Sequence, residues 1–176
     1  MSGFGDRLDA AAAVIDAAVA AIGRVGAWLV LVLTLAITFN VFLRYGFRTG
    51  AVWAQELEWH LLVPVVMIGL SYAFVQGEVV RVDFISKALP RAVQAAIDLF
   101  AALALLGICI FLVKLSIPFA MQAYLTGERS PNPSGLPHRF VIKAMLPVGF
   151  ALLGVHAVAW SCRATAVLLR AFGKGD

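Results

Sequence analysis

Ionisable side chains within long apolar stretches are the first places to look for chemistry in this sequence, because charge is costly in an apolar environment. In the four long apolar stretches, only Asp98, Lys114 and His156 are of this kind. Asp98 and Lys114 are 16 residues apart, which is roughly 24 Å along one helix, so they cannot pair with each other. We interpret both as groups near an interface, with the Lys114 ammonium reaching towards water.

The histidines raise the question of a haem group between helices. Ligation by two imidazoles requires two histidines at the same depth that face one cavity. His60 lies at the end of its apolar stretch, and His138 lies in a proline-rich segment. His156 is 12 residues past Ala144, or roughly 18 Å along its helix. Because these depths differ, we expect no cofactor. A membrane-anchor or haem-binding subunit of a redox complex is the alternative function.

Sequence motifs of common enzymes are absent. The chain has no phosphate-binding glycine loop, no HExxH zinc motif and no nucleophile elbow. The first, second and fourth apolar stretches also lack the acidic residue that a proton-coupled pump needs in mid-membrane. We therefore expect a non-catalytic protein that has no catalytic, substrate-binding or metal-binding residues of its own.

Composition places the chain in a membrane. Of its 176 residues, 62% are apolar and 14% are charged, whereas soluble domains are roughly 45–50% apolar and about 25% charged. The net charge of +4 then favours contact with anionic lipid headgroups and not with nucleic acid. We predict an all-α integral membrane protein, a single domain over residues 1–176. Because a spanning helix needs about 20 apolar residues, its four helices are expected at about 25–45, 57–77, 92–114 and 143–162.

Two further segments have the periodicity of short amphipathic surface helices. In 6–23 the apolar residues share one face, and Asp9 and Asp16, seven residues apart, share the other. The alternative for this segment is an early extension of the first span. The second segment is 81–93, where valine, isoleucine and leucine form a stripe. By contrast, 126–140 contains three prolines and two glycines, which predicts an irregular loop.

Basic residues predict the orientation. Four spans put both termini on one side of the membrane. That side carries eight lysines and arginines, against six on the other side. Because cytoplasmic loops are enriched in basic residues, we expect both termini in the cytoplasm.

A dense polar cluster joins the first two predicted spans. The stretch "RYGFRTGAVWAQELEWH" at 44–60 contains Arg44, Trp53, Glu56 and Glu58 between two apolar runs. Glu56 and Glu58 are two residues apart, so they point in different directions on a helix. We interpret the cluster as a contact site for a neighbouring helix or subunit. A solvated, charge-balanced membrane surface is the alternative.

Polar residues also follow the second predicted span. Arg81 and Asp83 flank Val82 where the chain leaves that span, and we interpret them as a second contact site, with the same alternative. Asn40, late in the first span, is expected to make an interhelical hydrogen bond.

These features, in their order and spacing, resemble a known family. The chain is similar to the small membrane subunit of tripartite ATP-independent periplasmic (TRAP) transporters, the DctQ-like proteins. The resemblance covers about residues 25–160. It is carried by "NVFLRYGF" at 40–47, "WAQELEWHLLVPVVMIGLSYAF" at 53–74, "GEVVRVDFI" at 77–85 and "LPVGFALLGVHAV" at 146–158.

The resemblance implies a function that composition does not. It implies a bacterial inner-membrane subunit that scaffolds a large transport subunit, which itself takes organic carboxylates from a periplasmic substrate-binding protein. Uptake would be driven by sodium. On this interpretation Arg44, Glu56 and Glu58 form one contact cluster with the large subunit, and Arg81 and Asp83 form the other.

Overall fold

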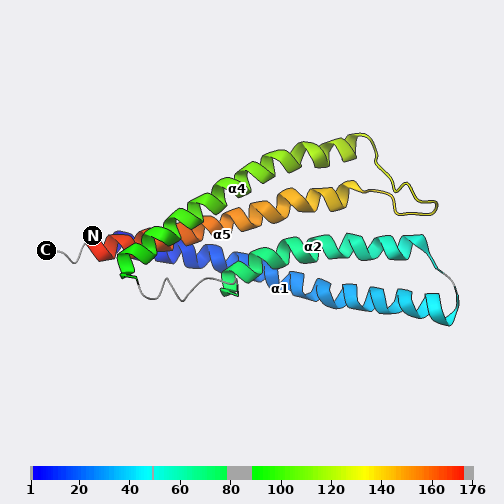
Figure 1. Cartoon of the computed structure of the whole chain (residues 1–176), viewed down its shortest axis with the longest axis horizontal. Helices are drawn as coiled ribbons and strands as arrows, with labels where there is room; N and C mark the ends of the chain where they lie inside the picture. The colour runs from blue at the N-terminus through cyan, green and yellow to red at the C-terminus, as the bar shows by residue number, and fades with distance from the viewer. Residues whose placement is uncertain (1, 49, 79–88, 173–176) are drawn as a thin grey trace.

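The computed structural model consists of long helices that run lengthwise along one bundle (Figure 1). It describes residues 2–48, 50–78 and 89–172. No strand occurs in these ranges. Four of the described helices are long and apolar enough to cross a membrane, as the sequence predicts. They are α1 (Ser2–Gly46), α2 (Val52–Gln76), α4 (Arg91–Leu125) and α5 (Phe140–Phe172).

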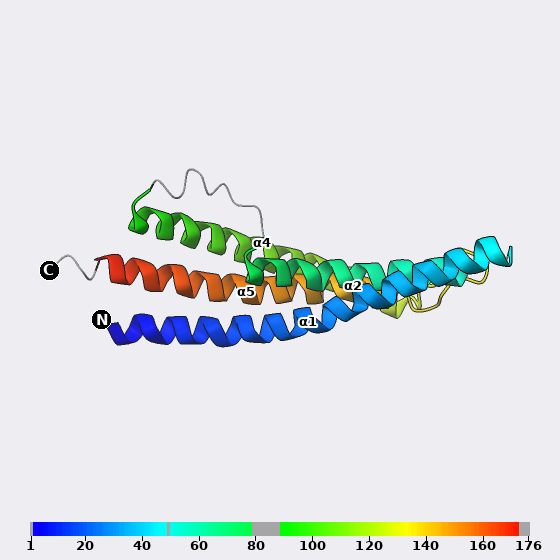
Figure 2. The same ribbon diagram turned by 90° about the horizontal axis from the view of Figure 1, so that it is seen from below.

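The bundle has two distinct ends. At the terminal end, α1 begins and α5 finishes (Figure 1). At the loop end, α1 is followed by α2, and α4 is joined to α5 by residues 126–139. Figure 2 shows α1 and α5 running side by side through the terminal half of the bundle.

Helix α5 is the central element, because α1, α2 and α4 all pack against it. The fourth tertiary contact joins α1 to α2. Figure 1 shows α4 on one side of α5 and the α1–α2 pair on the other. The position of every other helix therefore depends on contacts that α5 makes.

Glycines allow the helices to approach closely at these crossings. A Cβ atom added at Gly23 of α1 would overlap the Tyr72 side chain of α2, and one at Gly26 would lie 2.6 Å from Ile68 Cγ2. On α5, a Cβ at Gly149 would lie 2.6 Å from Met67 Cβ. In lipid, helices associate through such close packing because burial of apolar surface drives them together only weakly.

The helices are longer than the predicted spans. The expected segment 6–23 and the first span form one continuous helix, α1, so the structure has the early extension that was the alternative. The 45 residues of α1 are about 68 Å long, against about 30 Å for the hydrocarbon core of a bilayer. The sequence prediction counted only apolar stretches. Alanine-rich and charged flanking residues are good helix formers, so the helices continue past those stretches.

The other helices also extend past their predicted spans, at one end or at both. Helix α2 begins five residues before the predicted 57, and α4 continues to Leu125 instead of 114. Helix α5 runs from Phe140 to Phe172. Of the expected surface helix at 81–93, residues 81–88 lie outside the described residues. Pro90 directly precedes the first residue of α4.

Large apolar side chains remain exposed along α1 and α4. This is expected for surfaces that meet lipid or another membrane protein. Examples are Trp28, Leu31, Leu35, Phe39 and Phe42 on α1, and Ile97, Phe100, Leu103, Ile108 and Phe111 on α4.

The close approach at Gly23 can be tested by adding one methyl group. Gly23→Ala should lower the free energy of unfolding by about 1–3 kcal/mol, because Tyr72 Cβ and ring carbons block the new atom. Gly107→Ala is the matched control. Its added Cβ meets nothing within 4 Å, and alanine in a helix is favoured by roughly 0.5–1 kcal/mol. Thermal unfolding in detergent should show opposite shifts, and equal shifts for the two variants would contradict this packing.

Candidate functional site: polar contacts at the two ends of the bundle

At the loop end, Glu56 fastens the connection between α4 and α5 to α2. Its carboxylate accepts hydrogen bonds from Ser130 Oγ, from Asn132 Nδ2 at 3.0 Å and from the Leu136 backbone N–H at 2.7 Å. A carboxylate has enough lone pairs to accept all three. The predicted irregular loop is thus held in one position against the start of α2.

The loop has a backbone shape that suits this contact. Ser134 and His138 adopt positive φ angles of 65° and 66°. The Ser130 N–H donates to Leu136 O at 3.4 Å, and a Cβ on Gly135 would lie 2.8 Å from Glu56 Oε2. Glycine at 135 therefore lets the loop backbone come against the carboxylate.

Glu58 makes a different contact. Its Oε1 accepts a hydrogen bond of 2.6 Å from Asn40 Nδ2, which joins the last part of α1 to the first part of α2. This is an interhelical hydrogen bond of the kind expected for Asn40. Glu56 and Glu58 thus point to different neighbours, as their spacing requires.

Arg44 and Trp53 are left at the surface. Both side chains are exposed. Within the described ranges, Arg44 has no hydrogen bond or ion pair, so it does not pair with Glu56 or Glu58. Arg81 and Asp83, the other predicted contact residues, lie outside the described residues.

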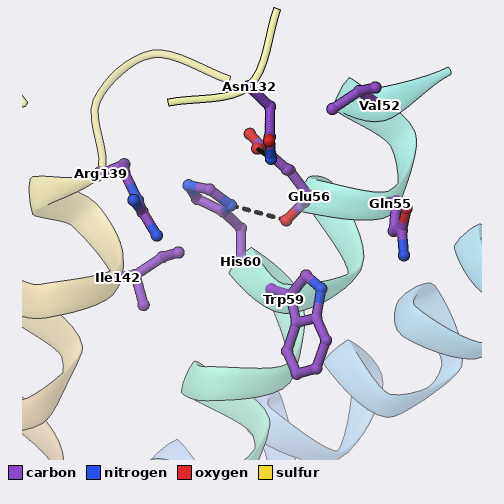
Figure 3. Close-up of a pocket in the computed structure, with 8 residues that line it drawn as sticks. All are labelled: Val52, Gln55, Glu56, Trp59, His60, Asn132, Arg139 and Ile142. Carbon is purple, nitrogen blue, oxygen red and sulfur yellow. Dashed lines mark hydrogen bonds between the residues drawn. The ribbon is translucent and has the colours of Figure 1, made fainter. Parts of the chain in front are cut away.

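A cavity of about 340 Å³ lies beside Glu56 (Figure 3). Its lining includes Trp59, His60 and Arg139. His60 Nδ1 lies 2.8 Å from the Glu56 backbone oxygen. Because a carbonyl can only accept, Nδ1 carries the proton, and Nε2 is an acceptor in the neutral ring. Nε2 is buried and has no hydrogen-bond partner among the described residues.

In the part of the chain that the structure describes, no three His, Cys, Asp or Glu residues are grouped to hold a metal ion. His60 and His156 line different cavities, at the loop end and towards the terminal end. The polar side chains that line the cavity beside Glu56 can donate and accept hydrogen bonds.

At the terminal end, a buried acidic residue joins α1 to α5. Asp16 is 5% exposed and His156 is 3% exposed. Asp16 Oδ1 lies 2.8 Å from His156 Nδ1, and Asp16 Oδ2 is paired with the Arg163 guanidinium. The carboxylate therefore has a basic partner on each side, in a place where an unpaired charge would be strongly destabilising.

A second ion pair lies further along the same two helices. Arg170 Nη2 lies 2.8 Å from Asp6 Oδ1 and 2.6 Å from Asp9 Oδ2, at the surface. The face of α1 that carries Asp9 and Asp16 thus meets α5, and is not simply solvated as an amphipathic surface helix would require.

Sequence reasoning missed this contact between α1 and α5, although a signal was present. Asp9 and Asp16 are seven residues apart, and so are Arg163 and Arg170. In antiparallel helices, two such pairs of opposite charge can meet in register, Asp9 with Arg170 and Asp16 with Arg163. That pattern could have been read from the sequence once the two segments were taken as neighbouring helices.

The geometry defines a class of protein. The chain is a helical integral membrane protein. Its described polar groups mostly connect its own helices and loop, and extensive apolar surface remains exposed. Comparison with known proteins specifies the family. Residues 33–166 match the family described as "Tripartite ATP-independent periplasmic transporters, DctQ component". The match covers more than half of the chain, and the chain belongs to this family.

Two curated relatives agree with this family. One is the ectoine TRAP transporter small permease protein TeaB of Halomonas elongata, 28% identical over 121 residues, which are 66% of this chain and 60% of that protein. The other is a putative TRAP transporter small permease protein of Haemophilus influenzae, 26% identical over 107 residues, which are 60% of this chain and 66% of that protein. The chain thus spans about three fifths to two thirds of these relatives' lengths. It is a TRAP transporter small subunit, a multi-pass protein of the bacterial inner membrane.

The Glu56 contact can be tested by hydrogen exchange. Glu56→Ala should increase exchange at the Leu136 amide roughly tenfold, because that N–H loses its charged hydrogen-bond acceptor. Gln55→Ala, at the neighbouring exposed position, is the control and should leave this amide protected. Equal exchange in wild type and Glu56→Ala would show that the carboxylate does not hold the loop.

The buried contact at the terminal end can be tested against its exposed neighbour. Asp16→Asn should reduce the free energy of unfolding by about 1–3 kcal/mol, because buried His156 loses a charged partner. Asp9→Asn, in the surface ion pair with Arg170, should reduce the free energy of unfolding much less, because water screens this exposed pair. Both are measured by thermal unfolding in detergent. A larger loss for Asp9→Asn than for Asp16→Asn would contradict the greater stabilisation that we assign to the buried contact.

Proposed function

We propose that this chain is the non-transporting scaffold of a sodium-coupled TRAP transporter that takes up organic carboxylates. Its partners would be a large membrane subunit, which carries the transport site, and a periplasmic substrate-binding protein. Both termini would lie in the cytoplasm, as the count of basic residues predicts. The loop end of the bundle would then face the periplasm.

One observation carries the scaffold role. Three acidic side chains that could serve transport are engaged within the chain: Glu56 with the loop, Glu58 with Asn40, and Asp16 with His156. At the same time, large apolar side chains stay exposed along α1 and α4. A rigid bundle with an apolar outer surface is suited to hold another membrane protein.

Among the residues of the predicted contact clusters, we propose that Arg44 and Trp53 contact the large subunit at the loop end. Both are exposed, and Arg44 has no partner among the described residues. Glu56, Glu58 and Asn40 would support this surface indirectly, by fixing the loop and the α1–α2 pair behind it. The contact roles of Arg81 and Asp83 remain predictions.

Transport by the reconstituted system tests sodium coupling and the substrate class together. Proteoliposomes with both membrane subunits and the binding protein should accumulate a radiolabelled carboxylate only with an inward sodium gradient. Radiolabelled ectoine is included as a second substrate because one relative is named for it. Potassium in place of sodium is the ion control. Uptake that is equal in sodium and potassium would overturn sodium coupling, and uptake of ectoine but of none of the common mono- and dicarboxylates would overturn the broader substrate class.

A further inference from the structure

A second cavity, of about 590 Å³, lies where α2 ends, between the first turns of α4 and the second half of α5. Its polar lining includes Arg91 and Asp98 of α4 and Arg163 of α5, and its apolar lining includes Phe74 and Val167. The function proposed above does not use it. Such a mixture of charged and apolar walls is suited to a ligand that has both kinds of surface.

The depth of the cavity corresponds to a membrane surface. Helix α2 has 25 residues, about 37 Å, which is close to the thickness of a bilayer with part of its headgroup region. Gln76 and Gly77, at the end of α2, line the cavity. The ligand would therefore meet lipid headgroups at this level. Basic pockets between membrane helices at the cytoplasmic face bind the anionic headgroups of cardiolipin and phosphoinositides, so basic residues at this level can hold a lipid phosphate.

The charges around the cavity indicate the headgroup. The Arg163 guanidinium is already paired with the Asp16 carboxylate. Arg91 and Asp98 form no ion pair with any described residue, which leaves one positive and one negative group. A headgroup that itself carries one phosphate and one ammonium matches this pair, whereas an anionic headgroup would leave the Asp98 carboxylate facing like charge.

Two neighbouring features add hydrogen-bonding capacity. Pro90 offers no side-chain cap to α4, so the first N–H groups of this helix favour a phosphate near Arg91. His156 also lines the cavity and is 3% exposed. Its Nδ1 bonds the Asp16 carboxylate, and its Nε2 is buried with no hydrogen-bond partner in the described ranges. In the neutral ring Nε2 can accept a hydrogen bond from an ammonium group.

We propose that this cavity binds a zwitterionic phospholipid with an ethanolamine headgroup. Its phosphodiester contacts Arg91 and the remaining donors of Arg163, and its ammonium contacts Asp98. The acyl chains leave the cavity past Phe74, which lies on the bilayer side of the end of α2. Bound in this way, the lipid fills the space between the end of α2 and the α4–α5 pair. This proposal concerns the chain alone and does not depend on the transport role.

Native mass spectrometry of the full chain in detergent tests the proposal. The delipidated protein is titrated with dioleoyl phosphatidylethanolamine or dioleoyl phosphatidylglycerol, and bound lipid is counted. Wild type should retain the ethanolamine lipid about tenfold more tightly, as expected for one additional charge-assisted contact. Water-soluble phosphoethanolamine forms a third arm. If it binds as tightly as the lipid, the site takes a free headgroup and the lipid assignment is overturned.

Two variants test the contributions of the Arg91 and Asp98 charges to lipid binding separately. Arg91→Gln should weaken binding of both lipids about tenfold, and Asp98→Asn should remove the preference for ethanolamine without preventing binding. Arg7→Ala, an exposed arginine at the terminal end, is the matched control and should bind as wild type does. Thermal unfolding confirms that each variant is folded, and Arg91→Met, which also removes the charge, replaces Arg91→Gln if that variant is not. Equal binding of the two lipids by wild type, or unchanged binding by the Arg91 variant, would overturn the proposal.

Discussion

The bundle must be held together by interactions other than the hydrophobic effect. In a bilayer, lipid tails are as apolar as leucine side chains, so helices associate through close packing and polar contacts. Helix α5 provides both. Gly149 brings it against Met67 of α2, and His156 and Arg163 bind the Asp16 carboxylate of α1. Because α4 also packs on α5, the whole arrangement depends on this one helix.

The two ends of the bundle are stabilised differently. At the terminal end a buried carboxylate lies between an imidazole and a guanidinium that belong to a distant part of the chain. At the loop end Glu56 holds an irregular loop by three hydrogen bonds. In both cases an acidic side chain that could serve chemistry is used to fix position. Such fixed positions are compatible with the proposed scaffold role.

The sequence was sufficient for the fold class and the family, because apolar stretches and the order of short motifs carry both. It was not sufficient for the ends of the helices. Apolar stretches show where lipid surrounds a helix, whereas hydrogen bonding and helix propensity decide where it ends, so α1 and α4 extend well past their predicted spans. The partners of Glu56 could not be predicted either. They lie more than 70 residues away, and a loop of three prolines has no periodicity to place it. The contact of Asp16 with Arg163 could have been predicted, because two aspartates of α1 and two arginines of α5 are each seven residues apart.

Recovery of the large subunit with a tagged copy of this chain tests the scaffold role most directly. From membranes that express both subunits, wild-type chain should recover the large subunit in equal amount, and the pair Arg44→Ala with Trp53→Ala should recover much less. Arg129→Ala, an exposed arginine in the loop at the same end, should recover as much as wild type. Equal recovery by all variants would contradict the proposed contact surface. Substrate uptake by liposomes that contain this chain alone would contradict the scaffold role itself.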